Sequence, residues 1–279
     1  MSPPREASHL DKAAPPGSSI YYALRFLPAE RRQALTAFAA FVREVRGMLE
    51  TVSDAGVAQA KLAWWHADVE RAASGQAQHP TLRVLSPHLH ERQIDHRLLA
   101  AIVEGARIDA EQTRFFDFAG LRHYGEHAGG IPMEVAARLL GHGSDATLRY
   151  AHTLGLALAL TELIRDTGGH AARGRLYLPI DELQRFDVRA QEVLQRQHSP
   201  RFEALMRFQC ERALETFDQA LAELPVADRR AQKPGLILAR IARALLTEIA
   251  DSGYPVLQQR IALTPLRKFW LAWRTQALG

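Results

Sequence analysis

Cysteine is almost absent from this sequence of 279 residues, which contains Cys210 and no other. A single cysteine excludes an internal disulfide, and without paired Cys and His residues at ligand spacing we expect no structural zinc site. The scarcity of cysteine favours a reducing compartment, so we expect a cytoplasmic protein.

Long apolar runs are missing as well. The most apolar stretch, LGLALAL at residues 154–160, is far too short to span a bilayer and is followed by Thr161, Glu162 and Arg165. The N-terminal segment MSPPREASHLDKAAPPGSS has no apolar core and does not read as a secretory signal. We expect no transmembrane segment, and a peripheral position at the inner face of the membrane is compatible with the sequence.

Neither sign of charge dominates the composition. Hydrophobic residues make up 47% and charged residues 24% of the chain, which is ordinary for a folded globular protein. The net charge of +4 is a mild bias that is compatible with anionic small molecules or acidic lipid. Few aromatic residues are interleaved with the arginines, so we do not expect the protein to bind nucleic acid.

No segment alternates apolar and polar residues with the period of two that is typical of a β-strand. Apolar residues from Leu35 to Leu49 instead recur at intervals of three and four, as do those in VAQAKLAWWHADVERAAS and PGLILARIARALLTEIADSGY. Gly- and Pro-containing breaks separate these stretches. The pattern predicts an all-α protein, with a flexible N-terminal arm at residues 1–18 and a single domain at residues 19–279.

Several segments together resemble the squalene/phytoene synthase family, and most closely the presqualene diphosphate synthases of the bacterial hopanoid pathway. They run from about residue 17 to the C-terminus and include GSSIYYALRFLP, FVREVRGMLE, AKLAWWHADVERA, EGARIDAEQTRFFDFAGLRHY, LTELIRDTGGHAARGRLYLP and GYPVLQQRIALTPLRKFWLAW. The resemblance implies the isoprenoid-synthase fold, a helical bundle around a central cavity. It also implies the joining of two prenyl diphosphates head to head, with Mg²⁺ held by two aspartate-rich helix segments.

Both aspartate-rich segments are altered here. The family pattern Asp-Asp-x-x-Asp falls on Arg46, Gly47 and, at its last position, Glu50. In the second pattern, Asp-x-x-Glu-Asp, the first acid is kept as Asp166, whereas Gly169 and His170 replace the others. In the same helix, Glu162 stands where the family usually has asparagine.

These replacements change the chemistry that the resemblance implies. Mg²⁺ prefers oxygen ligands and bridges carboxylates to the diphosphate, whereas an arginine at position 46 repels it. Imidazole at position 170 is a poor substitute. We therefore predict no metal site and regard Glu50 and Asp166 as vestigial acids, with the catalytic residues unknown.

Other residues match family positions near the diphosphate and are predicted to bind substrate. They are Ser19, Tyr22, Arg43, Arg46, Arg165, Arg173 and Tyr177. Arg43 and Arg46 lie one helical turn apart, and together they would make a fork for an anion without metal. Alternatives stay open for four positions. Ser19 would equally serve as a helix cap, Asp166 as an ion-pair partner of a neighbouring arginine, and Asp109 and Glu111 as partners of Arg107 or Arg114.

Two further features concern packing. Gly129 and Gly130 match a family segment in which small residues let the helix backbone approach a ligand or another helix, and Pro132 is expected to kink the helix or start a new one. The C-terminal RKFWLAWRTQAL mixes cations with Phe269, Trp270 and Trp273 and would suit a membrane interface. Because family members carry a similar tail, we expect these aromatic residues to pack into the core instead.

The sequence thus favours a paralogue that binds a prenyl diphosphate such as farnesyl diphosphate but has lost much or all prenyltransferase activity. Such a protein requires no cofactor, and it would act beside a partner enzyme of isoprenoid synthesis. The first alternative is an active farnesyl transferase that makes presqualene diphosphate or squalene, with Mg²⁺ and NADPH as cofactors. The second is a non-enzymatic assembly factor or lipid carrier.

Overall fold

The computed structural model describes residues 12–48 and 54–278, and over these ranges the protein is built from helices, with a single isolated β-bridge between Arg114 and Leu176. The all-α prediction is confirmed. The first half of the chain forms α2 (Ser19–Leu24), α3 (Ala29–Gly47), α4 (Ala55–Ala73), α5 (Pro80–Glu91), α6 (Arg97–Glu111), α7 (Phe118–Gly125), the π-helical turn η2 (Glu126–Gly130) and α8 (Ile131–Leu140).

The second half continues with long helices that are interrupted by one group of short ones. It forms α9 (Asp145–Arg165), α10 (Thr167–Ala172), α11 (Ile180–Arg185), α12 (Ala190–Leu194), α13 (Pro200–Glu223), the 3₁₀ turn η3 (Val226–Asp228), α14 (Lys233–Asp251) and α15 (Pro265–Leu278). No helix among the described residues is both long enough and apolar enough to cross a membrane.

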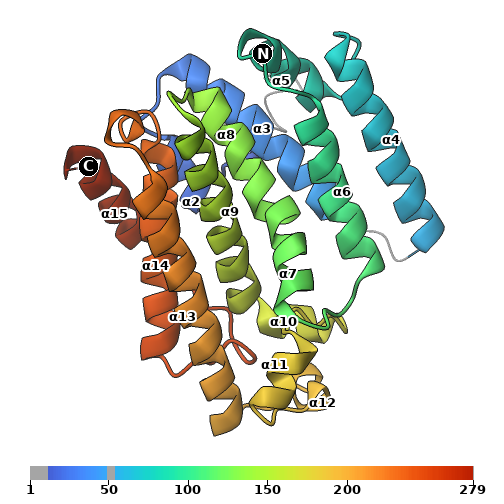
Figure 1. Cartoon of the computed structure of the whole chain (residues 1–279), viewed down its shortest axis with the longest axis vertical. Coiled ribbons are helices and arrows are strands. Elements are labelled where there is room, and N and C mark those ends of the chain that lie inside the picture. Colours follow the sequence, from blue (N-terminus) through green and yellow to red (C-terminus); the bar gives the residue numbers. More distant parts are fainter. Residues whose placement is uncertain (1–11, 49–53, 279) are drawn as a thin grey trace.

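Helix α9 lies at the centre of the bundle, between α13 and α14 on one side and α8 and η2 on the other (Figure 1). Its buried residues point in all directions around the helix, as expected for a helix enclosed by others. One hydrophobic core surrounds α9, and a second joins α3, α4, α5, α6 and α8. The short helices α10, α11 and α12 close one end of the molecule.

The crossing of α9 over η2 depends on two glycines. A Cβ atom added to Gly155 would lie 2.0 Å from the carbonyl oxygen of Gly129, and one added to Gly129 would lie 2.1 Å from the carbonyl oxygen of Gly155. The small residues therefore let two helix backbones touch. The prediction for Pro132 is confirmed, because a new helix, α8, begins at Ile131 directly after the π-helical turn.

The C-terminal aromatic residues do not fill the core as the sequence suggested. Trp270 and Trp273 are 50% and 53% exposed, and Phe269 is 37% exposed, whereas the buried positions of α15 are Ala272 and Thr275. The small residues face α14, so the two tryptophans point away from the bundle, whereas Phe269 packs against the ring of Tyr22. The prediction of core packing is wrong for Trp270 and Trp273.

The division of the chain at residue 18 remains a prediction, because residues 1–11 lie outside the described part. Within residues 12–18, Ala13 is buried, Ser18 accepts a hydrogen bond from the backbone N–H of Tyr21, and the carbonyl of Gly17 accepts one from Lys268. Ser18, not Ser19, caps α2, which excludes the capping role considered for Ser19.

Candidate functional site

The two helices that carry the altered motifs meet at their C-terminal ends. Arg46 near the end of α3 donates to Oε2 of Glu162 near the end of α9 across 3.2 Å. Burial lowers the pKa of the Arg46 guanidinium, but the charge and hydrogen bond of Glu162, with further contributions from Tyr124 and Asp109, together outweigh this effect and the net pKa is raised. Arg46 thus stands at a position where the family's first aspartate-rich pattern has a metal ligand, and its charge is already paired with Glu162 of α9.

Asp166, at the junction of α9 and α10, is shared by two arginines. Arg165 Nε donates to its Oδ1 across 3.1 Å, and Arg260 Nε donates to the same oxygen across 2.6 Å. Burial alone would raise the pKa of this carboxyl, but both guanidinium groups reverse the effect and hold the pKa below its usual value. The alternative reading of Asp166 as an ion-pair partner of Arg165 is confirmed.

Arg260 reaches the site because the loop before α15 is fixed against α10. The backbone N–H of Gly168 donates to the carbonyl of Val256 across 3.0 Å, and a Cβ atom at Gly168 would lie 2.5 Å from the carbonyl oxygen of Leu257. Lys268 follows on α15. Its ammonium group donates to the carbonyl of Gly17 across 3.1 Å, and burial together with repulsion from Arg165 and Arg260 lowers its pKa.

Arg46, Arg165, Arg260 and Lys268 form what we call the cationic cluster. The charge of Arg46 acts on Arg165, which links the two halves of the cluster. Three arginines here pair with two carboxylates, those of Glu162 and Asp166, and Lys268 adds a fourth positive charge, so the cluster carries more positive than negative charge. Such a group of donors can bind a multiply charged anion through charge-assisted hydrogen bonds.

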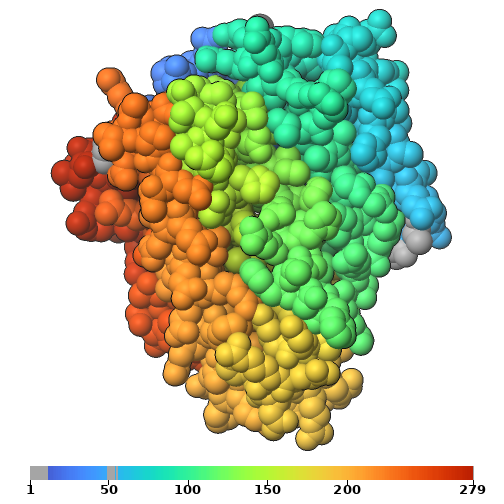
Figure 2. All heavy atoms as spheres, in the orientation of Figure 1, coloured from blue at the N-terminus to red at the C-terminus, as the bar shows by residue number. Residues whose placement is uncertain are grey.

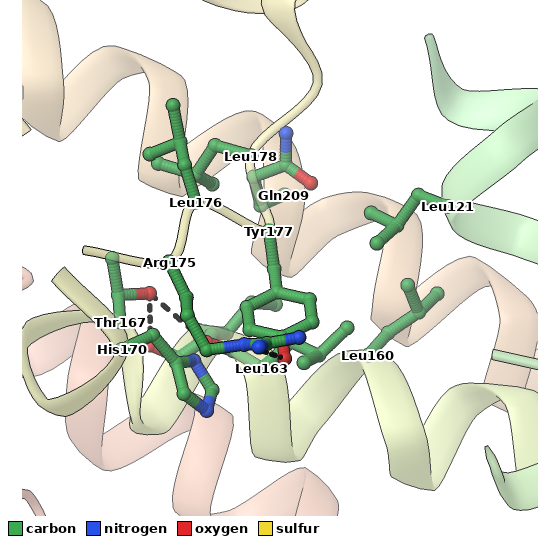
Figure 3. A pocket seen from close by; sticks show the side chains of 11 residues that line it. Leu121, Leu160, Leu163, Thr167, His170, Arg175, Leu176, Tyr177, Leu178 and Gln209 are labelled. Atoms are coloured by element: carbon green, nitrogen blue, oxygen red, sulfur yellow. Dashed lines mark hydrogen bonds between the residues drawn. The ribbon is translucent and has the colours of Figure 1, made fainter. Parts of the chain in front are cut away.

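A second polar network lies deeper, between α6 and the segment after α10. Asp109 accepts hydrogen bonds from the Tyr177 hydroxyl and from Arg175, whose Nη2 lies 2.8 Å from Oδ1. Arg175 Nε also donates to the Tyr177 hydroxyl across 2.7 Å, as the dashed line in Figure 3 marks. Burial and the Asp109 carboxylate both raise the pKa of Tyr177, so its hydroxyl remains protonated and acts as a donor.

His170 stands beside this network, with its ring centroid 4.5 Å from that of Tyr177. Burial, and after it the charge of Arg173, lower the pKa of His170 to about 4. Its Nδ1 atom is buried without a hydrogen-bond partner. The imidazole is therefore neutral at physiological pH, and it adds neither a carboxylate nor a cation to the site.

Two small interior pockets adjoin these groups. One is lined by Leu121, Leu160, Leu163, His170 and Tyr177, and the other by Arg46, Asp109, Tyr124 and His127. Each has a volume of about 10 Å³, which is roughly the room that one water molecule needs. A prenyl chain enters this region only if the surrounding side chains move apart.

The predicted substrate-binding residues are not all brought together. Arg46, Arg165 and Tyr177 belong to the groups described above. Arg43 instead donates to the carbonyl of Lys12 and lines a separate open pocket of about 620 Å³ with Lys61 and Trp64. The expected fork of Arg43 and Arg46 is not formed, because the two side chains bind different partners.

The remaining predicted positions lie apart or outside the described residues. The ring of Tyr22 is buried against Phe269 with a centroid separation of 6.1 Å, and Ser19 begins α2 next to the capping Ser18. Arg173 is exposed, and its positive charge contributes to the lowered pKa of His170. Glu50 lies outside the described residues, so its role as a vestigial acid stays a prediction.

Sequence reasoning missed two residues of the site and the partner of a third. Arg260 and Lys268 were part of the segment GYPVLQQRIALTPLRKFWLAW but were not assigned a role, since their contacts depend on how the loop at residues 252–264 folds back. The expected pairing with Arg107 or Arg114 is confirmed for Glu111, which binds Arg107, and is wrong for Asp109, which binds Arg175. The sequence signal for Tyr177 was the Tyr-Leu-Pro turn, and Arg175 lies two residues before this tyrosine.

The described residues do not fit the Mg²⁺ cluster that the aspartate-rich segments would hold. No group of three or more His, Cys, Asp or Glu side chains in residues 12–48 and 54–278 is arranged to bind a metal ion. Glu162, Asp166 and Asp109 each already accept from an arginine. Mg²⁺ needs a near-octahedral set of oxygen ligands, and here cations occupy the carboxylates that would supply them.

Comparison with known proteins shows which family this chain belongs to. The profile of the squalene/phytoene synthase family matches residues 13–267. The chain belongs to this family. It is 31% identical over 260 residues to a phytoene synthase of Mycobacterium tuberculosis, covering 91% of this chain and 84% of that protein. It is 27% identical to a 15-cis-phytoene synthase of Synechococcus elongatus, covering 90% of this chain and 85% of that one.

Solved structures of the family share the fold. A dehydrosqualene synthase in complex with a ligand superposes with a TM-score of 0.83 at 21% identity, covering 98% of this chain and 95% of its own. The squalene synthase HpnC from Alicyclobacillus acidocaldarius gives a TM-score of 0.77 at 20% identity, covering 90% and 97%. The isoprenoid-synthase fold predicted from the sequence is confirmed.

Proposed function

We propose that this family member binds a prenyl diphosphate through the cationic cluster, without a metal cluster, and that its head-to-head prenyltransferase activity is lost or much reduced. The observation that carries the proposal is the pairing of Arg46 with Glu162 and of Asp166 with Arg165 and Arg260. Cations stand where ligands for Mg²⁺ would be needed, and the carboxylates that remain are neutralised by them.

The cluster suits a diphosphate because its ion pairs are weak enough to open. The side chains of Arg46 and Glu162 are 40% and 46% exposed, and an exposed ion pair of this kind contributes only about 0–1 kcal/mol to stability. A diphosphate offers more oxygen acceptors and more charge than a single carboxylate. It would replace Glu162 as the partner of Arg46 and bind Arg165, Arg260 and Lys268 from the same side.

The prenyl chain would occupy the interior beyond the cluster. The leucines that line the pocket beside His170 come from α7, from α9 and from the segment between α10 and α11, and the pocket has a volume of about 10 Å³. Binding therefore requires these side chains to separate, and it would bury apolar surface of the ligand against them. Such burial gives a negative heat-capacity change, which is a measurable sign of chain insertion.

The described residues give little support to catalytic turnover. Departure of a diphosphate is assisted when metal ions neutralise the charge that develops on it. The described residues provide arginines and a lysine to bind the anion but no group of carboxylates to hold several ions. For this reason we place the chain with binding proteins of the family rather than with its active enzymes.

An active enzyme is the second candidate, and the 31% identity to a phytoene synthase favours it. It would use Glu50, Glu162, Asp166 and Glu111 around fewer metal ions. In the structure Glu111 is bound by Arg107 on the surface of α6, which removes it from the site. Assignment to the presqualene branch of the family also remains a proposal.

Incubation with labelled prenyl diphosphates distinguishes these candidates. The purified protein would be supplied with farnesyl diphosphate or a longer prenyl diphosphate, Mg²⁺ and NADPH, and the products separated by chromatography. We expect no condensed product above a control without protein. Formation of presqualene diphosphate, squalene or a longer homologue at an ordinary enzymatic turnover of about 1 s⁻¹ or faster would refute the proposal.

A role as lipid carrier or assembly factor is the third candidate. It requires a bound lipid or a stable protein partner when the protein is isolated from its cells. Native mass spectrometry reports both. A bound neutral lipid without affinity for diphosphates would favour the carrier over the function proposed above.

A further inference from the structure

The outer face of α15 carries a stripe of large apolar side chains that contact little of the protein. Leu266, Trp270 and Trp273 follow one another at intervals of four and three residues, so they lie on one side of the helix. They are 77%, 50% and 53% exposed. The helix lies at the edge of the molecule, at the left in Figure 2, beyond α14.

The opposite face of α15 is fixed to the bundle. Lys233 on α14 donates to the carbonyl of Gln276 across 2.7 Å, and Arg240 donates to the Thr275 hydroxyl across 3.3 Å. Arg267 is paired with Glu248. The helix is thus held in place with its tryptophans outward, and their exposure does not come from a loose end of the chain.

The charge around the stripe has one sign. Residues 252–279 contain Arg260, Arg267, Lys268 and Arg274 and no aspartate or glutamate. Arg274 lies over the ring of Trp270, with its guanidinium carbon 5.3 Å from the ring centroid. Arg267 is paired with Glu248 and Arg260 with Asp166, so Arg274 is the cation that lies directly at the stripe. Tryptophans beside an arginine match a surface that is apolar below and negatively charged above.

We propose that α15 docks the protein on an anionic lipid bilayer, with Leu266, Trp270 and Trp273 inserted at the level of the headgroups. Tryptophan suits this position because its ring is large and apolar while its indole N–H can bond to polar groups. Arg274 would face lipid phosphates and other anionic headgroups, whereas Arg267 stays paired with Glu248 of α14. The inference goes beyond the proposed function and is independent of it, since the tryptophans take no part in the cationic cluster.

Vesicle binding tests the inference. Sedimentation with vesicles of phosphatidylcholine and phosphatidylglycerol is expected to pull down the protein, and binding should weaken as salt is raised. Vesicles of phosphatidylcholine alone should bind much less. The double variant Trp270→Ala, Trp273→Ala is expected to lose about a hundredfold in affinity, since each ring removes a large apolar area from the interface.

Phe116→Ala provides a matched control, because Phe116 is an aromatic residue that is 77% exposed elsewhere on the molecule. It should bind anionic vesicles as the wild type does. Circular dichroism would establish that the variants fold. Equal binding of wild type and double variant, or no binding to anionic vesicles, would overturn the inference. So would self-association that depends on Trp270 and Trp273, because the stripe would then be an interface between copies.

Discussion

Single side chains decide the electrostatics of the site. Arg46 pairs with Glu162, and Arg165 and Arg260 both pair with Asp166. Both acids at the C-terminal end of α9 therefore have a cationic partner. A guanidinium is charged at every accessible pH and presents several donors in a fixed plane. The site therefore keeps its affinity for anions under conditions in which carboxylates or histidines would titrate.

Arg260→Ala tests this arrangement at the residue scale. Loss of one hydrogen-bonding charge is expected to weaken binding of a prenyl diphosphate by about 10- to 100-fold, which corresponds to roughly 1.5–3 kcal/mol. Isothermal titration calorimetry measures the change. Arg107→Ala is the matched control, because Arg107 is half exposed and binds Glu104 and Glu111 on the surface of α6. Equal losses in both variants would show that the cluster is not the binding site.

The pH dependence of stability should report the burial of His170. Its pKa is about 4 in the folded protein against an ordinary value of 6.5, so between these values the unfolded chain binds more protons. The free energy of unfolding therefore falls as pH is lowered from about 6.5 to 4. Urea unfolding at several pH values should show a smaller fall in His170→Asn. An identical fall in both proteins would mean that His170 is not held neutral by its surroundings.

At the scale of elements, the position of the site depends on where α9 crosses η2. Gly129 and Gly155 bring the two backbones into contact, and this contact fixes the part of α9 that precedes Glu162 and Asp166. The loop before α15 is positioned in a similar way by Gly168. Close packing of backbones leaves no space for even a methyl group.

Gly155→Ala is expected to destabilise the protein by about 3 kcal/mol or more, because the added methyl would lie 2.0 Å from the carbonyl oxygen of Gly129. Gly47→Ala is the control, since no atom of the described residues lies within 4 Å of a Cβ atom there. It should be neutral or stabilising by up to about 1 kcal/mol. Chemical denaturation compares the two. A loss of similar size at both positions would contradict the packing described for α9.

Much of this architecture could be predicted from the sequence, because apolar periodicity and glycine or proline breaks are local signals. The start of α8 around Pro132 and the loss of acids at Arg46, Gly47, Gly169 and His170 were visible in the same way. The partners of Asp109 and the approach of Arg260 to Asp166 were not, since they join positions 66 and 94 residues apart. The outward direction of Trp270 and Trp273 was also missed, because an amphipathic pattern does not say which apolar residues face the bundle.

For the molecule as a whole, the fold of an isoprenoid synthase is retained while the charge at the helix ends is reversed. This arrangement predicts that the metal clamp can be rebuilt. Gly47 has no neighbour within 4 Å of a Cβ atom, and Gly169 meets only the end of Arg173 at 3.9 Å, so both accept a side chain. Arg46→Asp, Gly47→Asp, Gly169→Glu and His170→Asp together should create affinity for Mg²⁺ that the wild type lacks.

Calorimetric titration of Mg²⁺ into both proteins measures that gain. A variant with acids at exposed positions elsewhere, Arg83→Asp, Arg92→Asp and Gln93→Glu, controls for the change in overall charge. The control should not bind Mg²⁺ measurably. If the fourfold variant folds but binds no more Mg²⁺ than this control, the site has lost more than its acidic residues.

The most direct measurement of the proposed function is titration of the wild-type protein with a non-hydrolysable farnesyl diphosphate analogue, once with Mg²⁺ and once with EDTA. We expect the same dissociation constant in both, because arginines and a lysine supply the contacts to the diphosphate. We also expect a negative heat-capacity change from insertion of the chain. Binding that occurs only in the presence of Mg²⁺ would contradict the metal-independent site.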